Sequence, residues 1–447
     1  MKSSSLFQDN LRGRRERCLN MGKVAPFLFS SVCLTTIFSL FIFYSPGPSK
    51  PLPFYSSRNP VNNAIPNKLD DTDQKLQLIT EPQNDDEKPQ LIEPQEKGGD
   101  ENCDLFKGHW VPDLKGSLYT NYSCSTIPES KNCFRQGRED KDFLNWRWKP
   151  DQCDLPRFDS IKFLEMVRGK KLAFVGDSVS RNHMESLLCL LSQVEVPIDV
   201  YKDSEGRNRI WRFPNHNFTL IVLWTKFLVE GEERMINGST TGVYDVYIDK
   251  VDEKWTKDLP DLDYVIISDA HWFFRPIYLH EAGNIVGCVY CDEPNVTRRE
   301  VSEAVGMALG SALKYINQCK KCKRVVTLLR TFSPSHFENG VWNTGGNCNK
   351  TNPSGETDID SGSSELGLRN AQVKELEIAR IRGEKRGKRF RVLDITMAML
   401  MRPDGHPGAF WGNKWMKGYN DCVHWCLPGP IDVWSDFLMA VMERTES

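Results

Sequence analysis

The sequence predicts an α/β domain built on a parallel sheet with helices on both faces. Short runs rich in apolar residues, typical of buried strands, occur at 172–175, 219–224, 264–267, 325–329 and 392–395. Helical apolar patterns separate several of these runs, most clearly at 301–316 and 371–382. Strands that alternate with helices in this way are typical of a parallel sheet covered on both faces. A chain of 447 residues with 39% hydrophobic content can bury such a core.

The charge balance points away from nucleic acid. The formal net charge is −2 and the basic residues are dispersed along the chain, so no basic footprint is indicated. A neutral substrate such as a sugar fits this composition.

An uncharged segment near the N-terminus, residues 24–44, is long enough for one helix to cross a bilayer. Basic residues precede it, among them Arg12, Arg14, Arg15, Arg17 and Lys23. The positive-inside bias therefore predicts a cytosolic tail at 1–23, a signal anchor at 24–44 and a luminal remainder. A cleaved signal peptide is the competing interpretation, but the run is long for one and no small-x-small cleavage site follows.

Residues 45–100 are rich in Pro, Gln, Asn, Asp and Glu, with few aromatic residues. Such a composition buries too little apolar area to offset the entropy of ordering, which predicts a disordered stem. A spacer that holds a domain off the membrane and an unconstrained linker would both have this composition.

Cysteine and tryptophan become frequent from residue 101, which marks a Cys/Trp-rich subdomain at 101–157. Of the 14 cysteines, two precede residue 45 and twelve lie in the predicted luminal part, which suits an oxidising compartment. The pairs Cys288/Cys291 and Cys319/Cys322 look like halves of a zinc site, but their spacing and compartment favour disulfides. Glycosylation sequons begin at Asn121, Asn217, Asn237, Asn295 and Asn349.

A candidate nucleophile lies in the turn after the first buried run. Gly176 and Asp177 end that run, Ser178 follows, and a helical pattern begins at Arg181. Ser178 thus lies at the carboxyl edge of the sheet, where ligands bind and where free amides of a helix N-terminus can stabilise an anion. A simple Gly-Asp-Ser turn is the plain alternative.

A base for this serine is available near the C-terminus. Asp421 and His424 are three residues apart, close enough for the carboxylate to orient the imidazole. Because an unassisted hydroxyl is a weak nucleophile, a Ser178–His424–Asp421 triad is the arrangement that would activate it. No histidine belongs to a metal-binding pattern such as HExxH, so no metal and no bound cofactor are expected.

These residues resemble the GDS and DxxH motifs of the plant trichome-birefringence-like family. The matching segments are GDSVSRN at 176–182 and DCVHWCLPG at 421–429, with further blocks at 110–113, 145–158, 333–348 and 402–411. The resemblance runs from Cys103 nearly to the C-terminus. It implies an SGNH/GDSL-like catalytic domain at 158–447 with a flavodoxin-type strand order, and a polysaccharide O-acetyltransferase activity.

The oxyanion of an acyl transfer needs donors close to the reacting carbonyl. Arg181 and Asn182, one turn beyond the serine, are candidates, and the resemblance brings Asn343 in the WNTGG loop to the same site. Asp177 and His271 are expected to shape the site. A solvated helix residue, a tight turn and a core histidine are the plain alternatives for Arg181, Asn343 and His271.

The resemblance implies a Golgi enzyme, a single-pass type II membrane protein, that acetylates a plant cell-wall polysaccharide through an acetyl-serine intermediate. The segment 176–191 is most similar to the subgroup that acetylates xyloglucan side-chain galactose. Xylan, mannan or pectin acetylation, an acetylesterase, and a noncatalytic wall-polysaccharide binding protein are the alternatives. The acetyl donor is open, acetyl-CoA included, because no nucleotide fingerprint is present. A protein that supplies acetyl groups across the membrane fits as a further partner.

Overall fold

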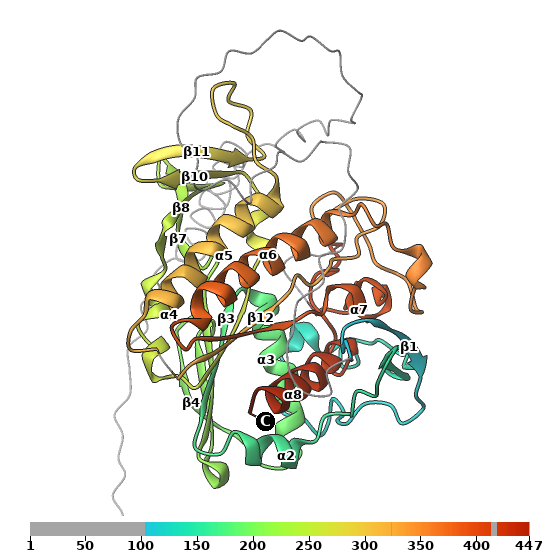
Figure 1. Cartoon of the computed structure of the whole chain (residues 1–447). Coiled ribbons are helices and arrows are strands. Elements are labelled where there is room, and N and C mark those ends of the chain that lie inside the picture. Colours follow the sequence, from blue (N-terminus) through green and yellow to red (C-terminus); the bar gives the residue numbers. More distant parts are fainter. Residues whose placement is uncertain (1–102, 323, 413–417, 447) are drawn as a thin grey trace, which may run out of the picture. The chain divides into compact units, whose positions relative to one another are not determined.

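The computed structural model describes residues 103–446 apart from residue 323 and residues 413–417 (Figure 1). The predicted tail, anchor and stem, residues 1–100, lie outside the described residues. Within the described part of the chain, no helix is both long enough and apolar enough to cross a membrane.

The central sheet has seven strands in the order β13-β12-β9-β3-β6-β5-β4. Its five parallel strands are β3 (Lys171–Gly176), β6 (Phe218–Trp224), β9 (Tyr264–Ser268), β12 (Val326–Arg330) and β13 (Arg389–Leu393). Each coincides with one of the apolar runs, so the parallel sheet predicted from the sequence is confirmed. Taken in chain order these five strands have the flavodoxin-type arrangement 2-1-3-4-5.

The sequence prediction of a purely parallel sheet was incomplete. Two antiparallel strands, β4 (Ile198–Lys202) and β5 (Arg209–Phe213), extend the edge beyond β6. A second sheet has the order β11-β10-β8-β7 and comprises β7 (Val229–Ile236), β8 (Ser239–Val251), β10 (Ile277–Glu281) and β11 (Asn284–Val289). Several of these strands are largely exposed, so they lack the continuous apolar run that reveals a strand buried on both faces.

Helices cover both faces of the central sheet (Figure 1). On one face α5 (Val301–Gln318) packs against α6 (Ser364–Glu384). On the other, α3 (Ser178–Leu191) packs against α8 (Val433–Glu446) and α2 (Ser160–Met166). The short helices are α4 (Glu253–Thr256) and α7 (Thr396–Leu400), with 3-10 turns at Glu129–Lys131, Asp142–Leu144, Pro214–His216, Leu259–Asp261, His271–Phe273 (η5), Glu356–Asp358, Pro403–Gly405 and Pro430–Asp432.

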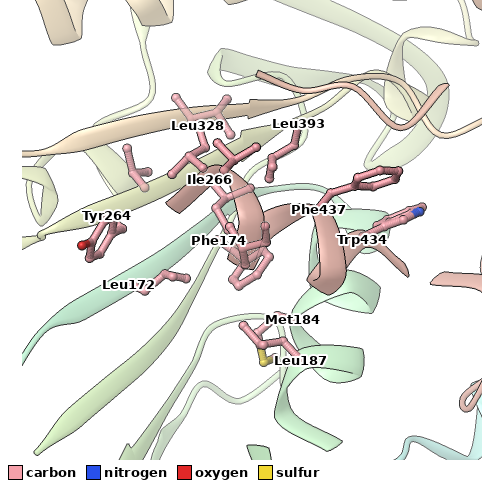
Figure 2. Packing of buried hydrophobic residues seen from close by; sticks show 14 of the residues in the cluster. Leu172, Phe174, Met184, Leu187, Tyr264, Ile266, Leu328, Leu393, Trp434 and Phe437 are labelled. Atoms are coloured by element: carbon pink, nitrogen blue, oxygen red, sulfur yellow. The ribbon is translucent and has the colours of Figure 1, made fainter. Parts of the chain in front are cut away.

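The core between the sheet and the helices α3 and α8 is made of alternate strand residues. Leu172 and Phe174 of β3 point to the same side as Ile266 of β9, and they face Met184 of α3 and Phe437 of α8 (Figure 2). All five side chains are essentially inaccessible to solvent. This layer fixes the strand that precedes Ser178 against the helix that follows it.

The Cys/Trp-rich segment forms a small subdomain around the hairpin of β1 (Gly108–Pro112) and β2 (Trp146–Pro150). All twelve cysteines of the described residues pair, as Cys103–Cys153, Cys124–Cys189, Cys133–Cys426, Cys288–Cys291, Cys319–Cys322 and Cys348–Cys422. The disulfides predicted for both CxxC pairs are therefore confirmed. Two of the bridges, to Cys189 and Cys426, join the subdomain to the central domain.

Candidate active site

The turn between β3 and α3 requires glycine at position 176. Its φ is +148°, and a Cβ there would lie 1.7 Å from the carbonyl oxygen of Ser268. Asp177 then caps the helix, because its carboxylate accepts hydrogen bonds from the amides of Val179 (2.9 Å) and Ser180 (3.4 Å). The helix consequently begins at Ser178, three residues before the start expected from the apolar pattern.

The three residues of the predicted triad lie together. The hydroxyl of Ser178 is 2.8 Å from Nε2 of His424, and Nδ1 of His424 is 2.9 Å from a carboxylate oxygen of Asp421. The side chain of Asp421 is 8% exposed and that of His424 is 23% exposed. The base is therefore reachable from solvent, whereas the carboxylate that orients it is shielded.

Asp421 is held as a carboxylate. Burial opposes its ionisation, but the charge and hydrogen bond of His424, with the amides of His424 and Val423, lower its pKa well below the usual range. An ionised Asp421 accepts a hydrogen bond from Nδ1–H of His424, which leaves Nε2 as the acceptor for the Ser178 hydroxyl. This tautomer is the one that general-base catalysis needs.

The loop that carries Asp421 and His424 is tied down on both sides. Cys422 is bonded to Cys348, and Cys426 to Cys133 of the N-terminal subdomain. Asp421 also exchanges two 2.9 Å backbone hydrogen bonds with Gly408. The bridges at Cys422 and Cys426 flank the histidine and so preorganise it.

Asn182 anchors this loop to α3 and does not face an oxyanion. Its side-chain oxygen accepts a hydrogen bond from the amide of Trp425 at 2.8 Å, and its side-chain nitrogen donates to the carbonyl of Trp425 at 3.3 Å. Both ends of the amide are thus engaged and the side chain is fully buried. Asn182 therefore positions the loop, which differs from the oxyanion-donor role expected from the sequence.

His406, which was not singled out from the sequence, holds the backbone of His424 in place. His406 donates from Nδ1 to the carbonyl oxygen of His424 at 2.7 Å, and its Nε2 lies 2.7 Å from Nδ1 of His336. Burial lowers the pKa of His406 well below the usual range, and His336 lowers it further, so His406 is neutral. Its occurrence in the block RPDGHPGAFW at 402–411 was the available signal.

A buried charge cluster lies beneath the nucleophile turn. Burial raises the pKa of Asp269 well above the usual range, and the charge of Asp177 raises it further. Burial opposes ionisation of Asp177 too, but His271, Arg330 and the amide of Val179 lower its pKa. Asp177 therefore carries the negative charge, Asp269 keeps its proton, and Arg330 is the buried counter-charge. Neither Asp269 nor Arg330 was singled out from the sequence.

His271 lies at the site, as expected for a residue after β9. Its amide is 3.3 Å and its Nδ1 is 3.5 Å from the carboxylate of Asp177, and its ring stacks on Phe332 at 4.9 Å between centroids. It braces the cap of α3 rather than contacting Ser178.

The other oxyanion candidates differ in their surroundings. Arg181 donates to the carbonyl of Gly206 at 3.3 Å and lies 3.5 Å from Glu185. Asn343 is exposed, in a turn connected to the site only indirectly, because Gly346 accepts a hydrogen bond from Asn420 at 3.0 Å. Among the described residues no hydrogen bond joins Asn343 to the triad.

The helix N-terminus offers fewer free amides than the sequence suggested. The amides of Val179 and Ser180 donate to the Asp177 side chain, and that of Arg181 donates to the Asp177 carbonyl at 3.2 Å. The amide of Ser178 itself finds no acceptor among the described residues, which leaves it available to a developing oxyanion.

The predicted sequon asparagines are accessible to different degrees. Asn121 is partly buried, while the other four, Asn217, Asn237, Asn295 and Asn349, are exposed. Their glycosylation remains a prediction.

Comparison with known proteins places this arrangement in a family. Residues 155–441 match the GDSL/SGNH-like acyl-esterase family found in Pmr5 and Cas1p, and residues 101–154 match the PMR5 N-terminal domain. The chain is 61% identical to xyloglucan O-acetyltransferase 4 of Populus trichocarpa, with 97% of this chain and 96% of the relative covered. It is 53% identical to xyloglucan O-acetyltransferase 2 of Arabidopsis thaliana, with 99% of each covered.

A more distant relative, protein trichome birefringence-like 19 of Arabidopsis thaliana, is 45% identical over 77% of this chain and 82% of its own length. These matches confirm the resemblance seen in the GDS and DxxH motifs, and they indicate an enzyme of the acetyltransferase or esterase type. The chain belongs to the GDSL/SGNH-like acyl-esterase family, among its trichome-birefringence-like members.

Proposed function

We propose that the protein is a Golgi O-acetyltransferase that acetylates the side-chain galactose of xyloglucan through an acetyl-serine intermediate. The observation that carries the chemistry is the continuous hydrogen-bonded series from Ser178 through His424 to Asp421. The acceptor is proposed from the names of the relatives that match this chain over nearly its whole length.

The reaction has two balanced halves. His424 takes the proton of Ser178 as the serine oxygen forms a bond to the acetyl carbonyl carbon. The tetrahedral intermediate collapses, the bond to the donor's leaving group breaks, and that group takes the proton from His424. A sugar hydroxyl then gives its proton to His424 and attacks the acetyl-serine carbonyl, and Ser178 leaves with that proton. Asp421 stabilises the imidazolium in both halves.

The triad serves transfer and hydrolysis equally, so the acceptor decides between them. The test incubates the full-length protein in detergent with isotopically labelled acetyl donor and xyloglucan oligosaccharides, and mass spectrometry follows the label. The same oligosaccharides stripped of galactose are the matched control. Label gained only by the galactosylated acceptor, and lost in Ser178→Ala, is the expected result.

Other outcomes separate the alternatives. Label on xylan, mannan or pectin fragments instead would reassign the acceptor. Loss of acetyl from pre-acetylated oligosaccharides without any gain would identify an esterase. Binding of oligosaccharide with neither reaction, and no labelling of Ser178 by a serine-reactive acyl probe, would identify a binding protein.

The luminal placement is part of the proposal and can be tested separately. The six disulfides support it, because such bonds persist in oxidising compartments. In sealed Golgi vesicles, a C-terminal epitope tag should resist added protease until detergent is present. A tag degraded in intact vesicles would place the catalytic domain in the cytosol.

A further inference from the structure

Two indole rings stand at the carboxyl edge of the central sheet, beside the nucleophile turn. Trp224 ends β6 and Trp272 lies in η5, after β9, with 5.8 Å between their ring centroids. Both strands flank β3, and Trp224 pairs in register with Gly176. His271, the neighbour of Trp272, donates its amide to Asp177. Since paired strands are about 4.8 Å apart, both rings arise within about two strand spacings of the triad serine.

Three cations lie over these rings. The guanidinium carbon of Arg207 is 4.5 Å from the ring centroid of Trp224. The ammonium of Lys226 is 4.8 Å, and the guanidinium carbon of Arg275 4.0 Å, from the ring centroid of Trp272. The indole faces hold the three charges at one place, because cations are attracted to aromatic faces. We call Arg207, Lys226 and Arg275, together with the two tryptophans, the cation–indole cluster.

The positive charges of the cluster repel one another, and nearby carboxylates neutralise them only in part. Burial lowers the pKa of Lys226, and Arg207, Arg275 and Lys254 lower it further, while Glu233 raises it. Among the ion pairs of the described residues, Arg207 pairs with Glu205 and Arg234 pairs with Asp245, and none includes Lys226 or Arg275. The Nε of Arg275 is buried and has no hydrogen-bond acceptor there. Like charges gathered in this way are unfavourable unless an anion joins them.

Two carboxylates border the cluster and are already engaged. Glu205 pairs with Arg207 at 2.8 Å, with its side chain 60% exposed. Glu233 accepts hydrogen bonds from the hydroxyl of Tyr244 at 2.9 Å and from the amide of Gly242 at 2.8 Å. The positive charge of the cluster is therefore only partly compensated.

The cluster is connected to the catalytic helix. Arg207 lies in the turn between β4 and β5, and the next residue, Asn208, accepts a hydrogen bond from the amide of Trp224 at 2.8 Å. Arg181, one turn beyond the serine on α3, donates to the carbonyl of Gly206 in the same turn. An anion bound at the cluster would thus sit on elements that also position the nucleophile.

We propose that the cation–indole cluster binds the phosphate groups of the acetyl donor, which is then a phosphate-bearing acetyl compound such as acetyl-coenzyme A. This inference rests on the proposed transferase function. Xyloglucan galactose is neutral, so the anion that this surface requires belongs to the donor rather than to the acceptor. Proteins commonly bind phosphate groups through arginine and lysine side chains that lie close together.

The test compares two donors with the full-length protein. Acetyl-coenzyme A carries phosphates, whereas S-acetyl-N-acetylcysteamine presents the same thioester without them. The quantity compared is kcat/KM with acetyl-coenzyme A divided by kcat/KM with S-acetyl-N-acetylcysteamine. Replacing Arg275→Gln or Lys226→Gln should lower this ratio by about tenfold, because one charge-assisted hydrogen bond is lost. Arg298→Gln is the matched control, because Arg298 is 70% exposed and pairs with Asp292 at the surface.

A binding measurement that needs no turnover accompanies the kinetics. Pyrophosphate should change the tryptophan fluorescence of the Ser178→Ala protein, compete with acetyl-coenzyme A but not with the acceptor, and bind about tenfold more weakly after Arg275→Gln. A donor ratio that R275Q and K226Q leave unchanged, or pyrophosphate binding equal with and without Arg275, would overturn the proposal. A protein that transfers acetyl from neither donor but binds pyrophosphate through Arg275 would count against the transferase function and overturn the assignment of the cluster to the acetyl donor, leaving only an anion site.

Discussion

Asn182 engages both backbone groups of Trp425, the residue after His424. The amide of Trp425 donates to the Asn182 oxygen at 2.8 Å, and the Asn182 nitrogen donates to the carbonyl of Trp425 at 3.3 Å. Asn182 is one turn beyond Ser178 on α3, so this pair links the nucleophile's helix to the loop that carries its base. This link therefore helps to set the 2.8 Å distance between the Ser178 hydroxyl and Nε2 of His424.

Replacing Asn182→Ala should lower kcat by about 10- to 100-fold with little change in KM, because a small displacement of the base is costly to catalysis. Unfolding free energy should fall by about 1–3 kcal/mol. Asn317→Ala is the matched control, since Asn317 is also buried and donates to a backbone carbonyl, that of Ala379 at 2.9 Å. It should lose stability but keep kcat. Equal losses of kcat in both variants would show that Asn182 acts through stability alone.

Replacing Asp421→Asn should lower kcat by about 10³- to 10⁴-fold while the melting temperature changes little. An asparagine cannot stabilise the imidazolium, and its NH₂ group can donate to Nδ1, which would favour the tautomer with the proton on Nε2. Transfer rates with a saturating donor and acceptor measure the effect, with circular dichroism to check folding. A variant within tenfold of wild type would remove Asp421 from the triad.

Removing the bridge Cys348–Cys422 by a double serine substitution should lower kcat about 10- to 100-fold, because Cys422 follows Asp421 directly. The bridge closes a sequence separation of 74 residues, so its loss should also destabilise the fold by about 4 kcal/mol in the loop-entropy model. The pair Cys319–Cys322, with a separation of only 3, is the control. Its removal should affect activity little; the opposite order of effects would contradict the positioning role of Cys422.

Replacing Asp269→Asn should stabilise the protein relative to wild type by an amount that grows with pH. Asp269 keeps its proton when folded, since burial and Asp177 raise its pKa, but loses it near pH 4 when unfolded. Above pH 4 the folded state therefore binds more protons, and wild-type stability falls by up to ~1.4 kcal/mol per pH unit relative to the variant. Denaturant unfolding at about pH 5 and about pH 8 measures this. A pH-independent difference would mean that Asp269 is ionised in the fold.

Asp177→Asn should behave in the opposite way. Its lowered pKa means that the charge stabilises the folded state above the unfolded pKa near 3.8, and that this stability is lost as the pH falls. The variant should be less stable than wild type at neutral pH and converge with it in acid. Parallel curves at all pH values would contradict the assignment of the negative charge to Asp177.

Several features were readable from local sequence. The runs at 172–175 and 264–267 are buried on both faces, so continuous apolar residues revealed them as strands. The start of α3 was placed three residues late because Asp177 caps the helix and Ser178 belongs to its first turn, where apolar periodicity gives no signal. Edge strands such as β4 were not predicted, because all five residues of β4 are exposed and form no continuous apolar run.

The residues of the site fall into the same two groups, those readable from local motifs and those whose roles long-range contacts set. Ser178, Asp421 and His424 were found because each occurs in a short motif whose spacing is itself the chemical requirement. Asn182 was singled out by its position, but as an oxyanion donor and not as the residue that holds Trp425. Asn343 was expected at the site, and among the described residues its turn is linked to the base loop only through neighbouring residues. Long-range contacts decided both cases: Trp425 is 243 residues from Asn182, and the turn of Asn343 joins the base loop only through its neighbours.

The sequence by itself determined the five buried parallel strands and the turn that presents the serine, and it singled out Ser178, Asp421 and His424 as a candidate triad, because apolar periodicity and motif spacing are local properties of the chain. Only the tertiary structure decided how the eight cysteines outside the two CxxC pairs are joined, which carboxylate of Asp177 and Asp269 is ionised, and which side chains brace His424. Those outcomes depend on burial and on distances between residues far apart in the chain, and such distances exist only once the sheet has assembled.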